Sequence, residues 1–532
     1  MAVSPFAAKL STNFVPCDSE LEEIRGYLAG YFAKLAELDS QIAQWQAKID
    51  ELAATRDCVK AVIGQHAALI SPMRRVPEDI LREIFLYCLA AEPVALVDAR
   101  RAPMLLTHVC ASWRHLAHAM PALWNSIHIP GGSFSQAGGL GDMLSFNAEV
   151  VAPWLNRTKG TSQLLSLSMS FKRPNQTWGL LLNEVFPRIR RLELKLESGD
   201  NSHMHLFLRQ TSRELPHLEC LKIDTKEDSG PNFWPTTALL GIPTLRSVSL
   251  RIRADPMKLP LPWDQLLELN LRCFFSATTI AAVFVGGLSV ADALDLLRRC
   301  PRLRKCSLQI TRGGQFQPRS LANAIELQDL AITDAIFLPQ LLERIDAPNL
   351  QRLSLSPKIG REDDDRPAFL NAIQPHAANL TSVDFVITLF NTQTLRSFLA
   401  MVPVLRELVL RSAAARSEGV IGREEILENS ILGSLTPMSA PDASVYCPLL
   451  THVEFASCAQ FSDWKLAEFI EKRMTCEVRP TLRSVIVSFE RPMLRDIMPH
   501  ISRFFAAGLR VQLEWSKSIA WRYDPHAGLC DL

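Results

Sequence analysis

Two lines of apolar residues near the start of the chain each recur at every seventh position. The first line consists of Leu21, Leu28, Leu35, Ile42, Ile49 and Ile63, with Arg56 interrupting it, and the second consists of Ile24, Tyr31, Leu38, Trp45, Leu52 and Val59. Lines offset in this way are the a and d positions of a coiled-coil seam. The pattern predicts a heptad helix over residues 20–71, ended by Pro72, after a disordered tail at residues 1–19.

This seam can pair with a second chain or fold back onto the domain that follows. Tyr31 and Trp45 are bulky side chains for the d positions of a parallel dimer. Intramolecular or heteromeric pairing is therefore the favoured expectation.

Another hydrophobic pattern, with apolar residues at its first, fourth and sixth positions, recurs along the rest of the chain. Its copies begin at residues 164, 189, 218, 245, 266, 303, 327, 350, 380, 405, 450 and 482, and in eight of them a proline stands two residues earlier. Self-similarity at intervals of mostly 21 to 32 residues, written L-x-x-L-x-L, is the signature of a leucine-rich-repeat solenoid. Each copy forms one strand, and stacked neighbours bury its alternate side chains. Apolar segments at 290–300 and 394–402 are the predicted outer helices.

The sequence therefore predicts an α/β fold whose solenoid spans residues 161–532. The third, fifth and seventh positions of each copy face its concave surface. These positions carry charges of both signs and no aromatic stripe, which is typical of a protein-recognition face and equally of a strand face that is merely solvated. The candidate contacts to a target protein are six basic residues: Arg191, Lys222, Arg251, Arg272, Arg352 and Arg411.

Between the heptad helix and the solenoid, the pattern predicts a small helical module at residues 72–130, followed by a linker at 131–160. Residues 73–89 place Pro77 in the first turn of a helix, where its missing N–H costs nothing, with Glu78 and Asp79 at the positive end of the helix dipole. A second amphipathic helical segment spans residues 105–127. A lone module of this size is marginally stable and usually needs a partner.

The two motifs of this module, V-P-E-D-I-L-R-E-I-F at residues 76–85 and V-C-A-S-W-R-H-L-A at 109–117, resemble an F-box. The whole arrangement is similar to the F-box-like proteins of mushroom-forming fungi, although Val76 replaces the usual leucine and the connection at 90–104 is longer than in most F-boxes. The resemblance implies docking onto a Skp-family adaptor that links to a cullin-RING ubiquitin ligase. Carried over by position, the contacting residues are Pro77, Ile80, Leu81, Ile84, Phe85, Val109, Cys110 and Trp113.

The composition and the absence of known motifs argue against several classes of function. The net charge is +1, so no overall field steers the chain toward nucleic acid or an anionic membrane. No phosphate-binding, nucleophile-elbow or zinc-binding motif occurs, and we expect no catalytic residue, cofactor or metal. The uncharged stretch from Cys273 to Ala291 is interpreted as a buried insertion within one repeat rather than a membrane span. The 12 cysteines, without C-x-x-C spacing, are expected to be reduced, buried thiols of a cytoplasmic or nuclear protein.

Together, these features predict a non-catalytic substrate-recognition subunit of an SCF-type (Skp–cullin–F-box) ubiquitin ligase. The module would bind the adaptor, and the repeats would bind an unknown target protein. The alternative is an interaction scaffold with no role in ubiquitin transfer.

Overall fold

The structure of the protein is a computed structural model that describes residues 4–10, 12–89, 94–129, 150–158, 162–171, 183–196, 208–225, 234–252, 254–272, 287–312, 321–335, 338–357, 366–412, 429–436, 446–459, 461–475, 482–489 and 491–515. Its internal contacts divide the chain into two compact units, Met1–Ile84 and Phe85–Leu532. The boundary falls inside helix α2 (Glu78–Tyr87). Most of the predicted insertion at 273–291 lies outside the described residues.

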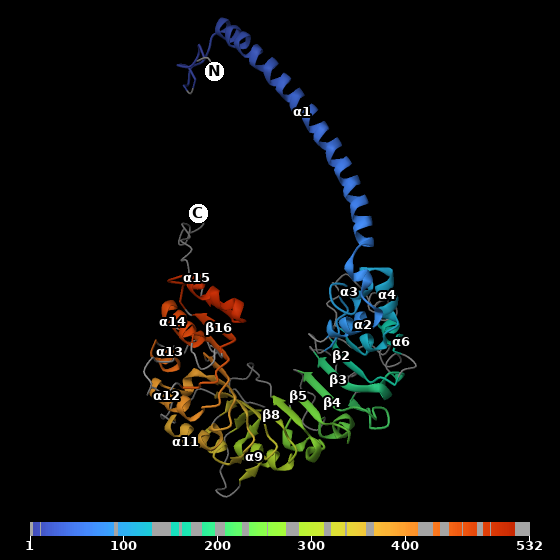
Figure 1. Ribbon diagram of the computed structural model, residues 1–532, viewed down its shortest axis with the longest axis vertical. Helices are drawn as coiled ribbons and strands as arrows, with labels where there is room; N and C mark the ends of the chain where they lie inside the picture. Colours follow the sequence, from blue (N-terminus) through green and yellow to red (C-terminus); the bar gives the residue numbers. More distant parts are fainter. Residues whose placement is uncertain are drawn as a thin grey trace, which may run out of the picture. The chain divides into compact units, whose positions relative to one another are not determined.

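The first unit is dominated by one long helix, α1 (Asp18–Leu69), followed by a short 3-10 helix, η1 (Pro72–Arg75) (Figure 1). The predicted heptad helix is therefore present. Residues 4–17, which belong to the predicted disordered tail, contact its first turns: the Phe6 and Tyr27 rings lie 5.9 Å apart, and Lys9 Nζ lies 2.7 Å from Glu20 Oε1.

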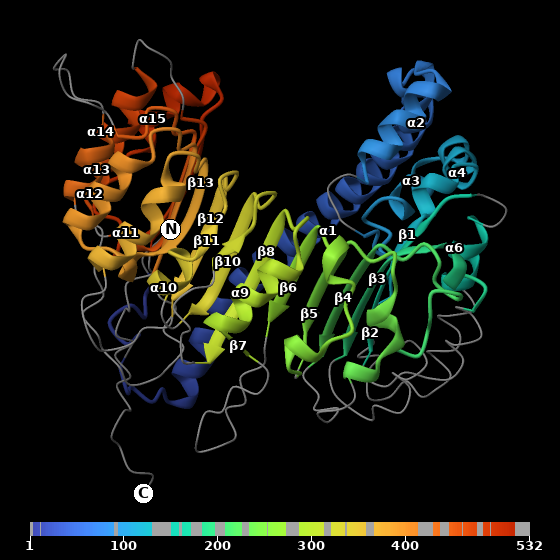
Figure 2. The ribbon, with the colours of Figure 1, turned by 90° about the horizontal axis from the view of Figure 1, so that it is seen from below.

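The second unit is built on one parallel sheet, which contains 15 strands within the described residues and is open rather than closed (Figure 2). The strands that begin at the twelve repeat copies lie side by side in chain order. They are β2 (Leu165–Phe171), β3 (Ile189–Leu196), β4 (Cys220–Thr225), β5 (Ser247–Arg251), β6 (Glu268–Arg272), β8 (Lys305–Arg312), β10 (Asp329–Ala335), β12 (Arg352–Pro357), β13 (Ser382–Val386), β14 (Glu407–Arg411), β15 (His452–Ala459) and β16 (Ser484–Phe489). This arrangement is consistent with a solenoid of the leucine-rich-repeat kind.

Alternate burial along each strand follows the repeat positions. In β3, Leu192 and Leu194 are at most 1% exposed, whereas Arg191 and Lys195 on either side of them are exposed. The register places the fourth positions of neighbouring copies opposite one another, as in Leu192 against Leu221. Stacked leucines therefore form a continuous core, and the sheet's other face carries the polar positions.

Helices lie along the apolar face of this sheet (Figure 1). The two helices predicted at 290–300 and 394–402 are α9 (Val290–Arg299) and α12 (Thr392–Met401). Each begins with a capping box: Ser289 Oγ accepts from the N–H of Asp292, and Asn391 Oδ1 accepts from that of Thr394. The others are α10 (Leu338–Leu342), α11 (Arg366–Ala377), α13 (Asn429–Leu435) and α14 (Asp463–Met474). Repeats near the start of the sheet have short 3-10 turns here instead, such as η6 (Trp234–Thr236) and η7 (Ala238–Gly241).

The sheet begins earlier than the repeat pattern predicts, with strand β1 (Ser126–Ile129) pairing with β2. Trp124, at the end of η2 (Pro121–Trp124), and Trp154, on α6 (Ala152–Asn156), are fully buried with their rings 4.8 Å apart. Both indole N–H groups are satisfied: Trp124 donates to the carbonyl of Ala117, and Trp154 to that of Trp124. The C-terminal part of the module and residues of the predicted linker thus form one core with the first strands.

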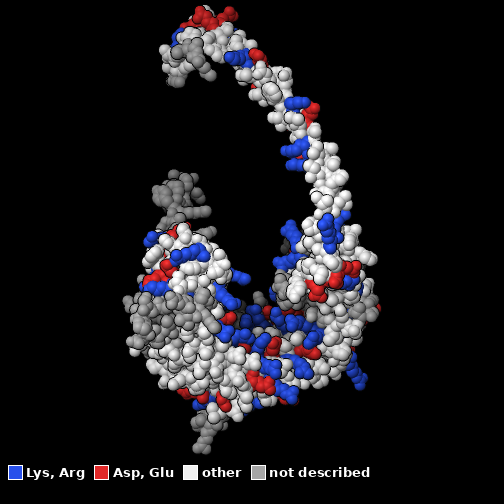
Figure 3. Space-filling model, in the orientation of Figure 1, with Lys and Arg blue, Asp and Glu red and all other residues white. Residues whose placement is uncertain are grey.

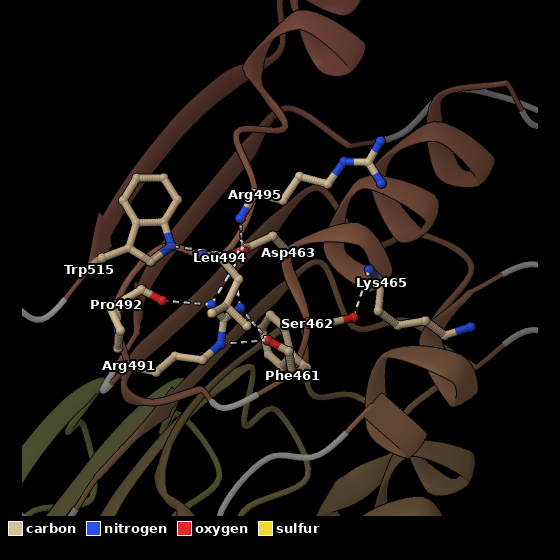
Figure 4. A network of polar contacts seen from close by, with 9 residues as sticks. All are labelled: Phe461, Ser462, Asp463, Lys465, Arg491, Pro492, Leu494, Arg495 and Trp515. Atoms are coloured by element: carbon tan, nitrogen blue, oxygen red, sulfur yellow. Dashed lines mark hydrogen bonds and ion pairs between the residues drawn. The ribbon is translucent and has the colours of Figure 1, made fainter.

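The opposite end of the sheet is capped by β17 (Arg510–Trp515), which pairs with β16, and by a buried ion pair (Figure 4). Asp463, whose side chain is 1% exposed, accepts from Arg491 at 2.8 Å, from the N–H groups of Leu494 and Arg495 at 3.0 and 2.9 Å, and from Trp515 Nε1 at 3.2 Å. Burial alone would raise the pKa of Asp463, but the hydrogen bonds from Arg491 and its other donors outweigh it and hold the pKa below its usual range.

We predict that Asp463→Asn destabilises this end of the sheet by about 3 kcal/mol, because Arg491 is left buried without its counter-charge. The lowered pKa means that this stabilisation is full above the unfolded pKa of about 4 and is lost as the pH falls toward the folded value. Urea denaturation at several pH values measures the difference between wild type and variant, which should shrink below about pH 4.

Asp496→Asn is the matched control, because Asp496 is exposed and asparagine caps the N–H of Met498 as well as aspartate does. Equal denaturation midpoints for wild type and Asp463→Asn at neutral pH would contradict the prediction.

Candidate protein-interaction site

Helix α2 carries two apolar stripes that face different surroundings. Leu81 and Phe85, four residues apart, are 7% and 0% exposed and belong to the core. Ile80, Ile84 and Tyr87 form a second stripe and are 49%, 36% and 77% exposed. An apolar stripe left in solvent on a helix that already has a buried face indicates a contact surface.

Two short helices follow, α3 (Met104–Val109) and α4 (Ala111–His118). Cys110 separates them and acts as the N-cap of α4, its Sγ accepting from the N–H of Trp113 at 3.5 Å. Leu106 and Leu116 point into the core, whereas Leu105 and Val109 are 44% and 54% exposed. These helices therefore also show apolar side chains to solvent.

The eight residues assigned to the adaptor contact thus separate into two groups. Pro77, Ile80, Ile84, Val109 and Cys110 are exposed, as a docking surface requires. Trp113 is half-buried, with its ring 4.9 Å from that of Phe85. Leu81 and Phe85 are buried in the isolated chain, where their side chains support the fold of the module.

The sequence assignment omitted two exposed residues, Tyr87 and Leu105. Tyr87 follows Ile84 by three positions, which is the helical spacing that places it on the same stripe. This spacing in the sequence is enough to place Tyr87 on the stripe of Ile80 and Ile84.

The longer connection between the two motifs contacts the sheet. Ala95 accepts a hydrogen bond from the N–H of His128 at 2.8 Å and donates its own N–H to Ser126 Oγ at 3.1 Å. Leu96 and His128 form a parallel bridge. The described part of this connection is therefore hydrogen-bonded to strand β1.

The six basic residues predicted to contact a target are all exposed on the polar face of the sheet, where Figure 3 shows both charges interspersed. Four of them already pair with an acid on a neighbouring strand. The pairs are Lys222 with Glu193, Arg251 with Asp224 at 3.5 Å, Arg352 with Asp329 at 2.9 Å, and Arg411 with Asp384 at 2.9 Å and Glu454 at 3.6 Å.

Arg191 on β3 and Arg272 on β6 differ from these four, since neither forms an ion pair within the described residues. A carboxylate of a partner could reach them without displacing an acid of this chain. Exposed ion pairs contribute only about 0–1 kcal/mol each, so the paired cations stay available for exchange as well.

A shallow depression of about 300 Å³ lies between these charges, over β5, β6, β8 and β10. Its floor has small polar or short side chains: Ser249, Asn270, Ser307 and Ala331. On its rim, Lys305 lies 2.9 Å from Glu268 and, through this hydrogen bond, lowers the pKa of that carboxyl. Asn270 Oδ1 is shielded from solvent and has no hydrogen-bond partner among the described residues.

The described residues contain no cluster of three metal-binding side chains and no helix long and apolar enough to cross a bilayer. Cys300, Cys306 and Cys447 are buried free thiols, and burial raises the pKa of Cys300 to about 12. Cys17, Cys58, Cys88 and Cys110 are exposed, so the expectation that the thiols are buried is wrong for these four.

We predict that Phe85→Ala lowers the free energy of unfolding of the module by about 3–5 kcal/mol, because it empties a fully buried site. Ile84→Ala, one position earlier on the same helix, should change it by no more than about 0.5 kcal/mol. Urea denaturation followed by circular dichroism compares the two variants, and equal losses of stability would contradict the assignment of the two stripes.

No family model matches the chain, and no curated protein matches it. Among solved structures, the chain is similar to the one titled "Crystal structure of TLR13-ssRNA13 complex", with 14% identity and a TM-score of 0.34. The match covers 66% of this chain and 46% of the other, so the chain spans less than half the length of that neighbour.

Proposed function

We propose that this chain is the substrate-recognition subunit of an SCF-type ubiquitin ligase. Its helical module would bind a Skp-family adaptor, and through it a cullin-RING ligase, while the polar face of the repeats binds a target protein. One observation carries the proposal: the two F-box-like motifs occur in order on α2 and at α3–α4, and these helices keep Ile80, Ile84 and Val109 in solvent.

Exposure of these apolar side chains to water is unfavourable for the isolated chain. A helix that needed apolar residues only for its own fold would place them on one buried stripe, as α2 does with Leu81 and Phe85. The second stripe gains nothing in the isolated chain, but its burial against a partner would contribute to binding. Helix-to-helix docking of this kind suits an adaptor with an apolar binding surface.

The polar face of the sheet would hold the target through shape and charge. Arg191 and Arg272 would attract carboxylates, and the depression over β5, β6, β8 and β10 would receive a side chain of the target. Holding the target beside the ligase raises its effective concentration there, which is the catalytic advantage that the proposal assigns to this chain. The proposal places the protein in the cytoplasm or nucleus and involves no cofactor, nucleic acid or membrane.

Binding of the full chain to a purified Skp-family adaptor tests the proposal. We expect a stable complex with wild type, and at least a tenfold loss of affinity, about 1.4 kcal/mol, with Ile84→Asp or Val109→Asp, because each buries a charge in the interface. Isothermal titration calorimetry gives the affinities.

Leu321→Asp is the control, since Leu321 is an exposed apolar residue of the repeats, 63% exposed, that lies outside the module. It should bind the adaptor as wild type does. Absence of a complex with wild type would overturn the ligase assignment and leave the scaffold reading, in which module and repeats assemble proteins without ubiquitin transfer.

A further inference from the structure

Over most of its length, the seam of helix α1 is not covered by other described residues of its own unit. From Leu28 to Ile63, its apolar side chains are 39–70% exposed, with Trp45 the most exposed. At 1.5 Å per residue the two lines extend for about 60 Å along the helix. An apolar stripe of this length exceeds what monomeric proteins leave in water.

The residues that precede α1 cover only its first turns. Phe6 packs on Tyr27, and Leu21 and Ile24 are half-buried there. Beyond these turns the seam remains open, so the N-terminal residues do not supply its partner.

Charges beside the seam indicate which partner fits. In a two-stranded parallel coiled coil, each g residue lies near the e residue five positions later on the other helix. For two copies of α1 in register, Lys34 meets Asp39 of the second copy, Gln41 meets Gln46, and Glu20 meets Arg25. All of these contacts are attractive or neutral, and Lys34 and Asp39 have no ion pair within the described part of the chain.

An antiparallel pair with the same overlap is less favourable. It brings e positions of the two copies together and so places Arg25 near Lys60. Like charges at these flanking positions oppose pairing. At the flanking e and g positions, the charges are therefore complementary in the parallel arrangement and not in the antiparallel one.

Arg56 occupies one a position of the seam and lies 2.9 Å from Asp57 of its own helix. A polar residue at a single a position lowers the stability of a coiled coil but fixes its register. In the in-register pair the two Arg56 side chains meet in a single layer, whereas a shift by one heptad would set each Arg56 against an apolar residue and so disrupt two layers. The in-register pairing is therefore favoured over slipped ones.

We propose that α1 pairs with α1 of a second copy of this chain as a parallel, in-register, two-stranded coiled coil. This dimer would carry two helical modules and two polar sheet faces, and a target with two recognition sites would bind it with an avidity greater than either single contact provides. The inference is independent of the adaptor proposal, since it rests on α1 alone.

Sedimentation equilibrium of the full chain gives its mass in solution. We expect the mass of two chains for wild type and of one chain for Ile42→Asp, which places a charge in the seam. Ala43→Asp is the matched control: it adds the same charge at the next residue, outside the seam, and should remain a dimer. A wild-type mass of one or of three chains would overturn the proposal.

Exchanging the two flanking charges tests the orientation. Lys34→Glu and Asp39→Lys should each weaken the dimer about tenfold, because each creates two like-charge contacts. The double variant should return to within about threefold of wild type, since it restores both pairs with reversed sign. A double variant as weak as the single ones would rule out the parallel arrangement. Circular dichroism checks that the helix content is unchanged.

Discussion

Each repeat strand of the large sheet depends on a neighbour on both sides to bury its alternate side chains. An interior strand has its neighbours in the adjacent repeats. Leu192 of β3, for example, lies opposite Leu221 of β4. The two ends need another solution. At the start, β1 and the buried Trp124 and Trp154 cap the sheet. At the other end, β17 and the Asp463–Arg491 pair cap it. Solenoids need such caps because their end repeats would otherwise expose the core.

This constraint also shapes the candidate contact surface. Residues of the helical module complete the core at the start of the sheet, since the Trp124 indole donates to the carbonyl of Ala117 on α4. A module held in this way has its stability from the sheet and does not need its exposed apolar residues for folding. Val109 and Leu105 are thus free to face a partner. The polar sheet face works differently, because its charges are largely paired across strands and offer shape and exchangeable ion pairs rather than a strong field.

The sequence predicts much of the fold because its signals are periodic. All twelve repeat copies become strands, and the helices at 290–300 and 394–402 start at side-chain caps that the sequence contains. β1 and β17 were missed because an end strand lacks the full repeat. The two stripes of α2 could not be distinguished, since Ile80 and Leu81 are chemically alike and only packing decides which one is buried. The ion pairs join residues of different repeats, such as Asp329 and Arg352, and depend on strand register.

We propose that a Skp-family adaptor binds the exposed apolar surface of α2, α3 and α4. Hydrogen exchange of the full chain with and without the purified adaptor measures this surface directly. We expect slower exchange of amide protons in α2, α3 and α4 on adding the adaptor, with the strands β5–β14 unchanged. Protection confined to the sheet, or none anywhere, would contradict it.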